Sequence, residues 1–224
     1  MKNIIITESE FEKLIKVLTK KLKDLNNKSS FGKSGNLKDQ LKKLLNIGLS
    51  GKESDVFSND HPIIKDNTVS LKKYPSDLDQ KMKNAVGSSV YNDFIKNVKS
   101  INLDPKIAMR QLYSESGFSE DVIKCKRKSS AGAQGIAQFM PSTWSSYGTG
   151  SPCNPKQALE AYVKLMDKLI DMFPGRLDLA IAGYNSGPYR SEYKTALKNK
   201  TPFEKLKGKI PNETYNYTVS ILQP

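Results

Sequence analysis

Histidine is almost absent from this chain of 224 residues, which contains only His61. That residue lies in a stretch rich in Ser, Asp, Asn, Lys and Pro, so we expect a solvated side chain there rather than a site. The Ser/His/Asp, Cys/His and HExxH arrangements all need a histidine inside the folded domain. Peptide cleavage by these common routes is therefore not expected.

Cysteine is scarce as well, because only Cys125 and Cys153 occur. Neither has CxxC or zinc-ligand spacing, so we expect no metal site. A bridge between them would add about 3.5 kcal/mol in the chain-entropy model, but two free thiols and a reducing compartment of synthesis are the better expectation. The sequence also lacks GxxxxGK[ST] and strand-GxGxxG-helix motifs, so we expect no nucleotide and no other cofactor.

Long apolar runs are missing too. No run approaches the roughly 18 residues of a membrane span, so we expect no transmembrane segment. The first residues, MKNIIITESEFEKL, lack the apolar core and the small-residue cleavage site of a secretory signal. We therefore expect no signal peptide and synthesis in the cytoplasm, with something else carrying the protein if it acts outside a membrane.

Positive charge is abundant. The chain has 36 Lys and Arg against 23 Asp and Glu, a net charge of +13. Most of this excess lies in the second part of the chain, residues 81–224. A basic surface favours polyanionic partners such as nucleic acid, anionic lipid or an acidic cell wall. The basic residues are dispersed without interleaved aromatics, so we expect no nucleic-acid partner.

Hydrophobic periodicity divides the chain. Residues 1–47 predict an N-terminal helical extension, because Thr7 and Glu10 form a capping box ahead of an apolar stripe. This extension could dock on a partner, lie on an anionic membrane or pack on its own domain. Residues 48–87 lose the periodicity, which predicts a linker or an irregular segment.

Residues 88–224 predict a catalytic domain of the mainly α class with little or no β, because no segment shows a period of two. Asp104 with Pro105, and Asn154 with Pro155, are N-cap and N1 pairs that begin helices. Further helices are expected from Ser89, from Leu177 to about Tyr184, and from about Glu213.

One acid in this domain suggests chemistry. Glu115 lies in the last turn of a helix that Gly117 ends, where the helix dipole disfavours an ionised carboxylate. Tyr113, Phe118 and the apolar loop Ile136–Met140 would desolvate it and raise its pKa toward ~6, where it can protonate a glycosidic oxygen. By itself this pattern is weak, since a lone helical glutamate is more often a solvated surface residue.

Four segments in a fixed order carry a resemblance to a known family. They are QLYSESGF (Gln111–Phe118), SSAGAQGIAQFMPSTW (Ser129–Trp144), AIAGYNSGP (Ala180–Pro188) and ETYNYTVSIL (Glu213–Leu222). Over about residues 88–222 the chain resembles the soluble lytic transglycosylases, which belong with goose-type lysozymes in the lysozyme-like α+β superfamily. The resemblance implies a helical lysozyme-like domain that acts on the glycan strands of peptidoglycan.

In this family one glutamate cleaves the β-1,4 bond between N-acetylmuramic acid and N-acetylglucosamine, and its motif position is Glu115. The resemblance implies that Glu115 protonates the leaving oxygen while the substrate N-acetyl carbonyl assists at the anomeric carbon. The carboxylate then takes the proton of the C6 hydroxyl, which closes a 1,6-anhydro ring. No water is consumed, and no second protein carboxylate is needed.

The resemblance also implies supporting roles. Ser129 would hydrogen-bond the sugar, orient Glu115 or simply cap its loop, while Gln138 and Met140 would line the saccharide cleft, with core packing as the alternative for Met140. Tyr184 would turn its hydroxyl toward the acid. The remaining matched residues are Asn185, for sugar or loop; Glu213 and Tyr217, for structure or cleft; and Ser116, for hydrogen bonding at the helix end.

Two departures and two alternatives remain open. The basic run Lys124–Lys128 lengthens the stretch after Glu115 and is either a solvated loop or a contact to wall carboxylates. Ile136-Ala137 replaces the usual leucine-methionine pair.

A muramidase on the same scaffold would use water, positioned by Glu120 or Asp121. An inactive wall-binding or virion structural protein is the alternative of another class. We expect a bacteriophage protein, carried in the virion or released at lysis, whose N-terminal helix docks on an assembly partner.

Overall fold

The structure is a computed structural model that describes residues 72–223 of the chain. The predicted N-terminal extension, residues 1–47, lies outside the described residues, as does most of the predicted linker. In the described range the helices, with one 3-10 helix, are α3 (Leu78–Val86), α4 (Ser88–Ser100), α5 (Pro105–Ser116), α6 (Glu120–Ile123), α7 (Pro141–Tyr147), α8 (Pro155–Met172), α9 (Leu177–Ser186), α10 (Ser191–Lys198), η1 (Phe203–Leu206) and α11 (Asn212–Leu222).

The class predicted for this domain, mainly α with little or no β, is confirmed. Over residues 72–223 the only strand-like pairing is an isolated antiparallel bridge between Gln134 and Phe139. Two helix starts were also predicted correctly. The Asp104 carboxylate accepts the N–H of Lys106, and the Asn154 amide oxygen accepts two N–H groups at the start of α8, with Pro at the first position of each helix.

One part of the predicted linker is wrong. Residues 78–86, expected to be irregular, form α3, whose Leu78 and Met82 are buried. Their spacing of four places both side chains on one helical face, and α3 packs by this face on α4 and α5. A stripe of only two residues, surrounded by Lys, Asp and Gln, was too short to stand out in the sequence.

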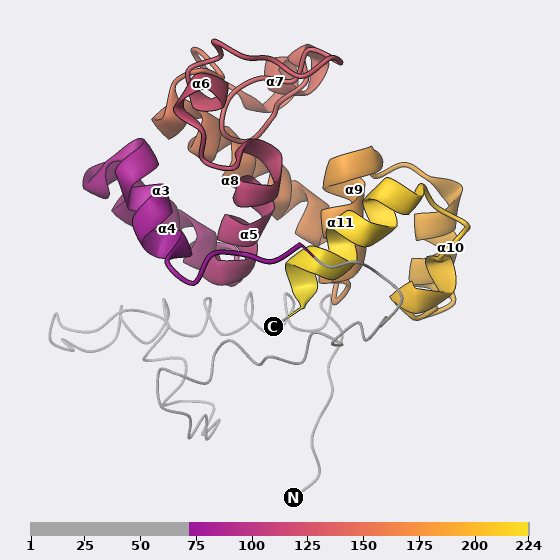
Figure 1. Cartoon of the computed structure of the whole chain (residues 1–224). Helices are drawn as coiled ribbons and strands as arrows, with labels where there is room; N and C mark the ends of the chain where they lie inside the picture. The colour runs from indigo at the N-terminus through magenta and orange to yellow at the C-terminus, as the bar shows by residue number, and fades with distance from the viewer. Residues whose placement is uncertain (1–71, 224) are drawn as a thin grey trace, which may run out of the picture. The chain divides into compact units, whose positions relative to one another are not determined.

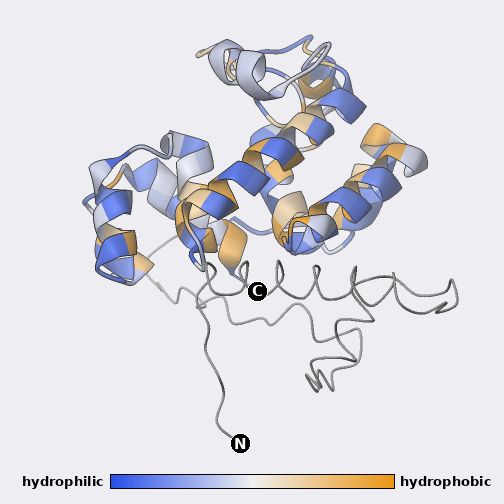
Figure 2. Ribbon diagram, turned by 180° about the vertical axis from the view of Figure 1, so that it is seen from behind, coloured by the Kyte–Doolittle hydropathy of each residue, from blue (hydrophilic) through white to orange (hydrophobic). Residues whose placement is uncertain are grey.

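The core lies around α8 and α9. The buried stripe of α8 includes Leu159, Tyr162 and Met166, and this helix packs on α4, α7 and α9. Figure 2 shows apolar and polar residues alternating along such helices, as expected where one face is buried. By contrast α9 is buried over most of its length, because it lies between α8 and α11.

The packing of α11 positions the candidate site. Although α11 ends the described chain and α5 lies about a hundred residues earlier, the two helices are neighbours (Figure 1). The contacts of α11 with both α5 and α9 bring the first, third and fourth sequence motifs together. The second motif forms the loop between α6 and α7, together with α7 itself.

Candidate active site

Glu115 lies in the last turn of α5, as predicted. Gly117 ends the helix in the left-handed conformation, with φ of 59°, and its N–H donates to the Tyr113 carbonyl. The Ser116 hydroxyl donates to the Leu112 carbonyl and accepts the Phe118 N–H, which confirms its expected role at the helix end. The end of α5 is therefore held firmly next to the acid.

The carboxylate of Glu115 has one hydrogen-bond donor from a distant element. The Tyr217 hydroxyl of α11 donates to Glu115 Oε1. This bond joins the first and fourth motifs directly. Glu213, one turn before Tyr217 on α11, is exposed and contributes its charge to the surroundings of Glu115.

Burial raises the pKa of Glu115 to about 7, in the direction that the sequence predicted. The Tyr217 hydrogen bond and the charge of Lys72 both lower this pKa, because they favour the carboxylate, whereas the charge of Glu213 raises it. The result is an acid that is about half protonated near neutral pH. Such a group can both give and take a proton.

Aromatic hydroxyls surround the acid. The pKa values of Tyr162, Tyr184 and Tyr217 are all raised, first by burial and then by the nearby charge of Glu115, so these hydroxyls stay protonated. The rings of Tyr162 and Tyr184 meet edge to face with centroids 5.7 Å apart. These neutral hydroxyls and rings contribute to the desolvation of Glu115.

The hydroxyl of Tyr184, which the resemblance turns toward the acid, has a pKa raised by burial and by the charge of Glu115, but it does not donate to the carboxylate. It donates instead to the Ala137 carbonyl at 2.6 Å and so fastens the second motif to α9. The hydroxyl that donates to Glu115 is that of Tyr217. Tyr217 lies on α11, which packs on α5, whereas Tyr184 lies on α9, and the packing of these helices decides which hydroxyl donates to the carboxylate.

Asn185 ties two helices together. Its side-chain oxygen accepts the hydroxyl of Thr214, a buried residue of α11, at 2.6 Å. Asn185 thereby holds α11 on α9, a contact that the sequence did not predict. This bond lies one turn before Tyr217 and helps to set the position of its hydroxyl.

The glycine-rich loop, residues 129–140, is held by its own hydrogen bonds. The Ser129 hydroxyl accepts the N–H of Ala133 at 2.8 Å, which is the loop-capping alternative for this residue. Gln138 donates to the Gly135 carbonyl at 2.8 Å. Met140, at 38% exposure, is one of the most exposed large apolar side chains among residues 72–223, so core packing does not describe it.

Gly135 allows a close approach to this loop. A Cβ atom there would lie 1.9 Å from the Pro152 carbonyl oxygen, and its φ is 75°. The segment before α8 therefore packs directly on the backbone of the loop, a contact that only glycine permits.

The expectation of two free thiols is wrong. Cys125 and Cys153 form a disulfide, with their Cα atoms 5.4 Å apart. Cys125 follows α6, and Cys153 follows Pro152, which packs on Gly135. The fold brings the segment after α6 to the segment before α8, and this proximity does not show in the sequence separation of 28 residues.

The four basic residues of the run Lys124–Lys128 are exposed. Lys124 pairs with Glu120 at 2.5 Å and Lys126 pairs with Asp121 at 3.6 Å. These contacts fit the solvated loop, the simpler of the two expectations. They also occupy both carboxylates that the muramidase alternative would use to position water.

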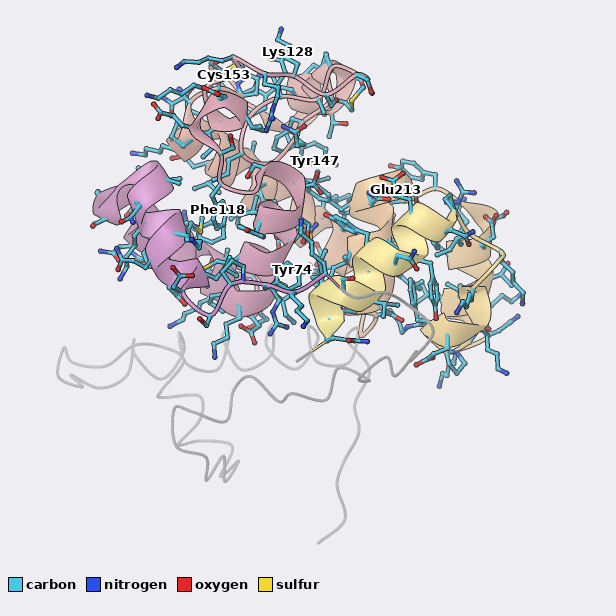
Figure 3. All side chains as sticks on the ribbon, in the orientation of Figure 1. Tyr74, Phe118, Lys128, Tyr147, Cys153 and Glu213 are labelled. Atoms are coloured by element: carbon cyan, nitrogen blue, oxygen red, sulfur yellow. A yellow bond between two sulfur atoms is a disulfide. The ribbon has the colours of Figure 1, made fainter. Side chains whose placement is uncertain are left out.

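Sequence reasoning missed Lys72. Its ammonium donates to the Tyr113 carbonyl at 3.4 Å and contributes charge to Glu115, although the residue precedes α3 in a segment expected to be irregular. No motif marks it, and its position follows only from the path of the chain across α5 (Figure 3 labels Tyr74 on this path).

Within residues 72–223, no group of three or more His, Cys, Asp or Glu side chains could hold a metal ion. In the same range no helix has the length and apolar character needed to cross a membrane.

A family model matches this chain. The transglycosylase SLT domain model covers residues 92–207, slightly more than half of the chain. The matched range includes Glu115, the glycine-rich loop, the disulfide and α9, and it ends before α11.

Proposed function

This chain belongs to the transglycosylase SLT domain family, and from that premise we propose that it cleaves peptidoglycan between N-acetylmuramic acid and N-acetylglucosamine with Glu115 as its only acid and base. Membership supports a lysozyme-like helical fold and action on peptidoglycan as an enzyme. The observation that carries the finer proposal is the site of Glu115, a desolvated acid with a pKa of about 7 that is bonded to Tyr217.

The reaction needs one group to act twice. Protonated Glu115 gives its proton to the glycosidic oxygen as the bond from that oxygen to C1 of the muramic residue breaks, and the N-acetyl carbonyl oxygen bonds to C1. The Glu115 carboxylate then takes the proton of the C6 hydroxyl, and O6 displaces the N-acetyl oxygen at C1. The product is a 1,6-anhydro ring, and the acid is regenerated without water.

Between these two steps Tyr217 stabilises the ionised form of Glu115. Its hydroxyl donates to Glu115 Oε1 and so stabilises the carboxylate that exists after the first proton transfer. Burial favours the neutral acid that begins the cycle. The two effects oppose each other, which keeps either protonation state accessible near pH 7.

The exposed, ion-paired positions of Glu120 and Asp121 favour this reaction over hydrolysis. An ordinary inverting or retaining glycosidase needs a second carboxylate beside the first. Glu213 is exposed and one turn from Tyr217, and we assign it an electrostatic role on Glu115. Gln138 and Met140 line the saccharide side of the loop in this proposal.

The proposal is tested by release of soluble fragments from purified peptidoglycan. We expect Glu115→Gln to lower the rate by at least ~100-fold, because it removes the proton donor but keeps the acceptor of the Tyr217 bond. The matched control is Glu120→Gln, which changes an exposed carboxylate on α6 and should keep the wild-type rate.

Two results would contradict the proposal. A wild-type protein that binds the wall without releasing fragments would favour the inactive binding protein. Loss of activity in Glu120→Gln, with activity kept in Glu115→Gln, would place the acid elsewhere.

A further inference from the structure

Residues 72–75 lie next to the helices of the candidate site, although they precede the family match, which begins at residue 92. We call this segment, Lys72–Pro75, the strap. Figure 1 shows it as the indigo coil before α3, running beside α5 and close to the end of α11. These are the two helices that carry Glu115 and Tyr217.

The strap is bonded to both helices. The backbone N–H of Lys72 donates to the Ser220 hydroxyl of α11 at 3.3 Å. The Lys72 ammonium donates to the Tyr113 carbonyl of α5 at 3.4 Å and lies 5.2 Å from the centre of the Tyr113 ring. One residue therefore spans the two helices within one turn of the acid and within one turn of its donor.

Tyr74 provides a second attachment. Its hydroxyl shares a hydrogen bond of 2.9 Å with that of Ser114, the residue before Glu115. The Arg110 guanidinium lies 5.7 Å from the centre of the Tyr74 ring and donates to backbone carbonyls of Ile221 and Gln223. The strap, the last turns of α5 and the end of α11 thus form one connected group.

We propose that two residues of the strap, Lys72 and Tyr74, belong to the active site and that Lys72 is a positioning residue, which holds the end of α5 on α11 and places a positive charge near the Glu115 carboxylate. This inference rests on the proposed function of Glu115. Lys72 acts through Tyr113 and through its charge rather than by touching the sugar, so its effect concerns how easily Glu115 loses its proton.

The charged and titratable groups around Glu115 come from each element packed on it. They are Lys72 and Tyr74 of the strap, Tyr162 of α8, Tyr184 of α9, and Glu213 and Tyr217 of α11. Lys72 is the group among them whose charge favours the carboxylate, while Glu213 opposes it. Loss of the Lys72 charge should therefore raise the pKa of Glu115.

The test compares the full-length wild type with Lys72→Met, Lys72→Arg and Lys73→Met. Lys73 is the neighbouring exposed lysine, so its variant removes the same charge without the contacts to α5. In Lys72→Met we expect the high-pH limb of kcat/KM to move up by about half a pH unit or more, because an opposite charge near a carboxyl lowers its pKa. Lys72→Arg should restore most of the wild-type profile, and Lys73→Met should leave it unchanged.

A second readout does not depend on catalysis. The Glu115 carboxyl can be titrated by carbon-13 NMR in each full-length variant, and its pKa should rise in Lys72→Met alone. If the pKa of Glu115 rises in Lys72→Met but the wild-type protein does not cleave peptidoglycan, the role of Lys72 is supported and the proposed function is wrong. An unchanged Glu115 titration in a folded Lys72→Met protein, or an equal rise in Lys73→Met, would overturn the inference. If Lys72→Met does not fold, Lys72→Gln takes its place. A Glu115 pKa in Lys72→Gln equal to that of the wild type would then overturn the inference.

Discussion

At the scale of single residues, the site depends on the balance between the neutral and the ionised form of the Glu115 carboxyl. Burial favours the neutral form of Glu115, while the Tyr217 hydroxyl and the Lys72 charge favour the ionised form. A carboxyl in water would be almost fully ionised at pH 7 and could not donate a proton efficiently. The balance near pH 7 is what allows a single group to serve in both halves of the proposed reaction.

This balance lowers the stability of the folded protein at high pH. The pKa of Glu115 is about 7 in the folded protein, against an ordinary 4.5, so the folded state binds more protons than the unfolded state between these values. The free energy of unfolding must therefore fall as pH rises through this window and level off above about pH 7.

The variant Glu115→Gln should remove that dependence. At pH 8 we expect it to be more stable than the wild type by roughly 1–3 kcal/mol, and the difference should vanish toward pH 4. Urea denaturation at both pH values measures this, with Glu120→Gln as the control that gains nothing at pH 8. A difference between Glu115→Gln and wild type that does not change with pH would show that Glu115 has an ordinary pKa.

The sequence predicted the helix-end position and the raised pKa of Glu115 but not all of its partners. Glu115 could be found because a helix end, flanking aromatics and a motif coincide at one place in the chain. The bond from Tyr217, rather than from Tyr184, could not be predicted, because it depends on the rotation of α9 and α11 in the core. Lys72 carried no signal at all, since a lysine in a polar segment is ordinarily solvated.

At the scale of elements, the glycine-rich loop is held in place by contacts from several other segments. Tyr184 holds it at Ala137, and Pro152 packs on Gly135. The disulfide joins the segment after α6 to the segment before α8, beside that contact. The loop is therefore held at two points, as the wall of the proposed saccharide cleft must be.

Two glycines of this loop make a matched pair for a test of that packing. Both have positive φ, 87° for Gly132 and 75° for Gly135, but a Cβ would meet nothing within 4 Å at Gly132. We expect Gly132→Ala to lower the free energy of unfolding by about 1 kcal/mol, from backbone strain alone. Gly135→Ala should cost about 3 kcal/mol or more, because the Pro152 backbone must also move.

Chemical denaturation of both variants, together with their rates of peptidoglycan release, measures these effects. Equal losses of stability in the two variants would mean that Pro152 does not press on the loop as described.

Helix starts were the elements that the sequence predicted best. Asp104 with Pro105 and Asn154 with Pro155 carry their own capping chemistry, so no tertiary information was needed. By contrast α3 is a short amphipathic helix that exists because its two buried residues fit against α4 and α5. The disulfide escaped prediction for the same reason, because only the folded chain brings its two cysteines together.

At the scale of the whole molecule, the site is assembled from segments distant in the sequence. The strap, α5, the glycine-rich loop, α9 and α11 each supply one part, and the family match covers the middle three. Apart from α3, which forms inside the predicted linker, the division of the chain into extension, linker and catalytic domain stays a prediction. So does the docking of the N-terminal helix in a virion or at lysis, because residues 1–47 lie outside the described range.

If one carboxyl cleaves the glycan without consuming water, the masses of muropeptides made in oxygen-18 water will show it. We expect muramic ends that are one water lighter than hydrolytic products and carry no oxygen-18. The Glu115→Gln protein should give neither species. Reducing ends that carry oxygen-18 would contradict the account and make this protein a hydrolase.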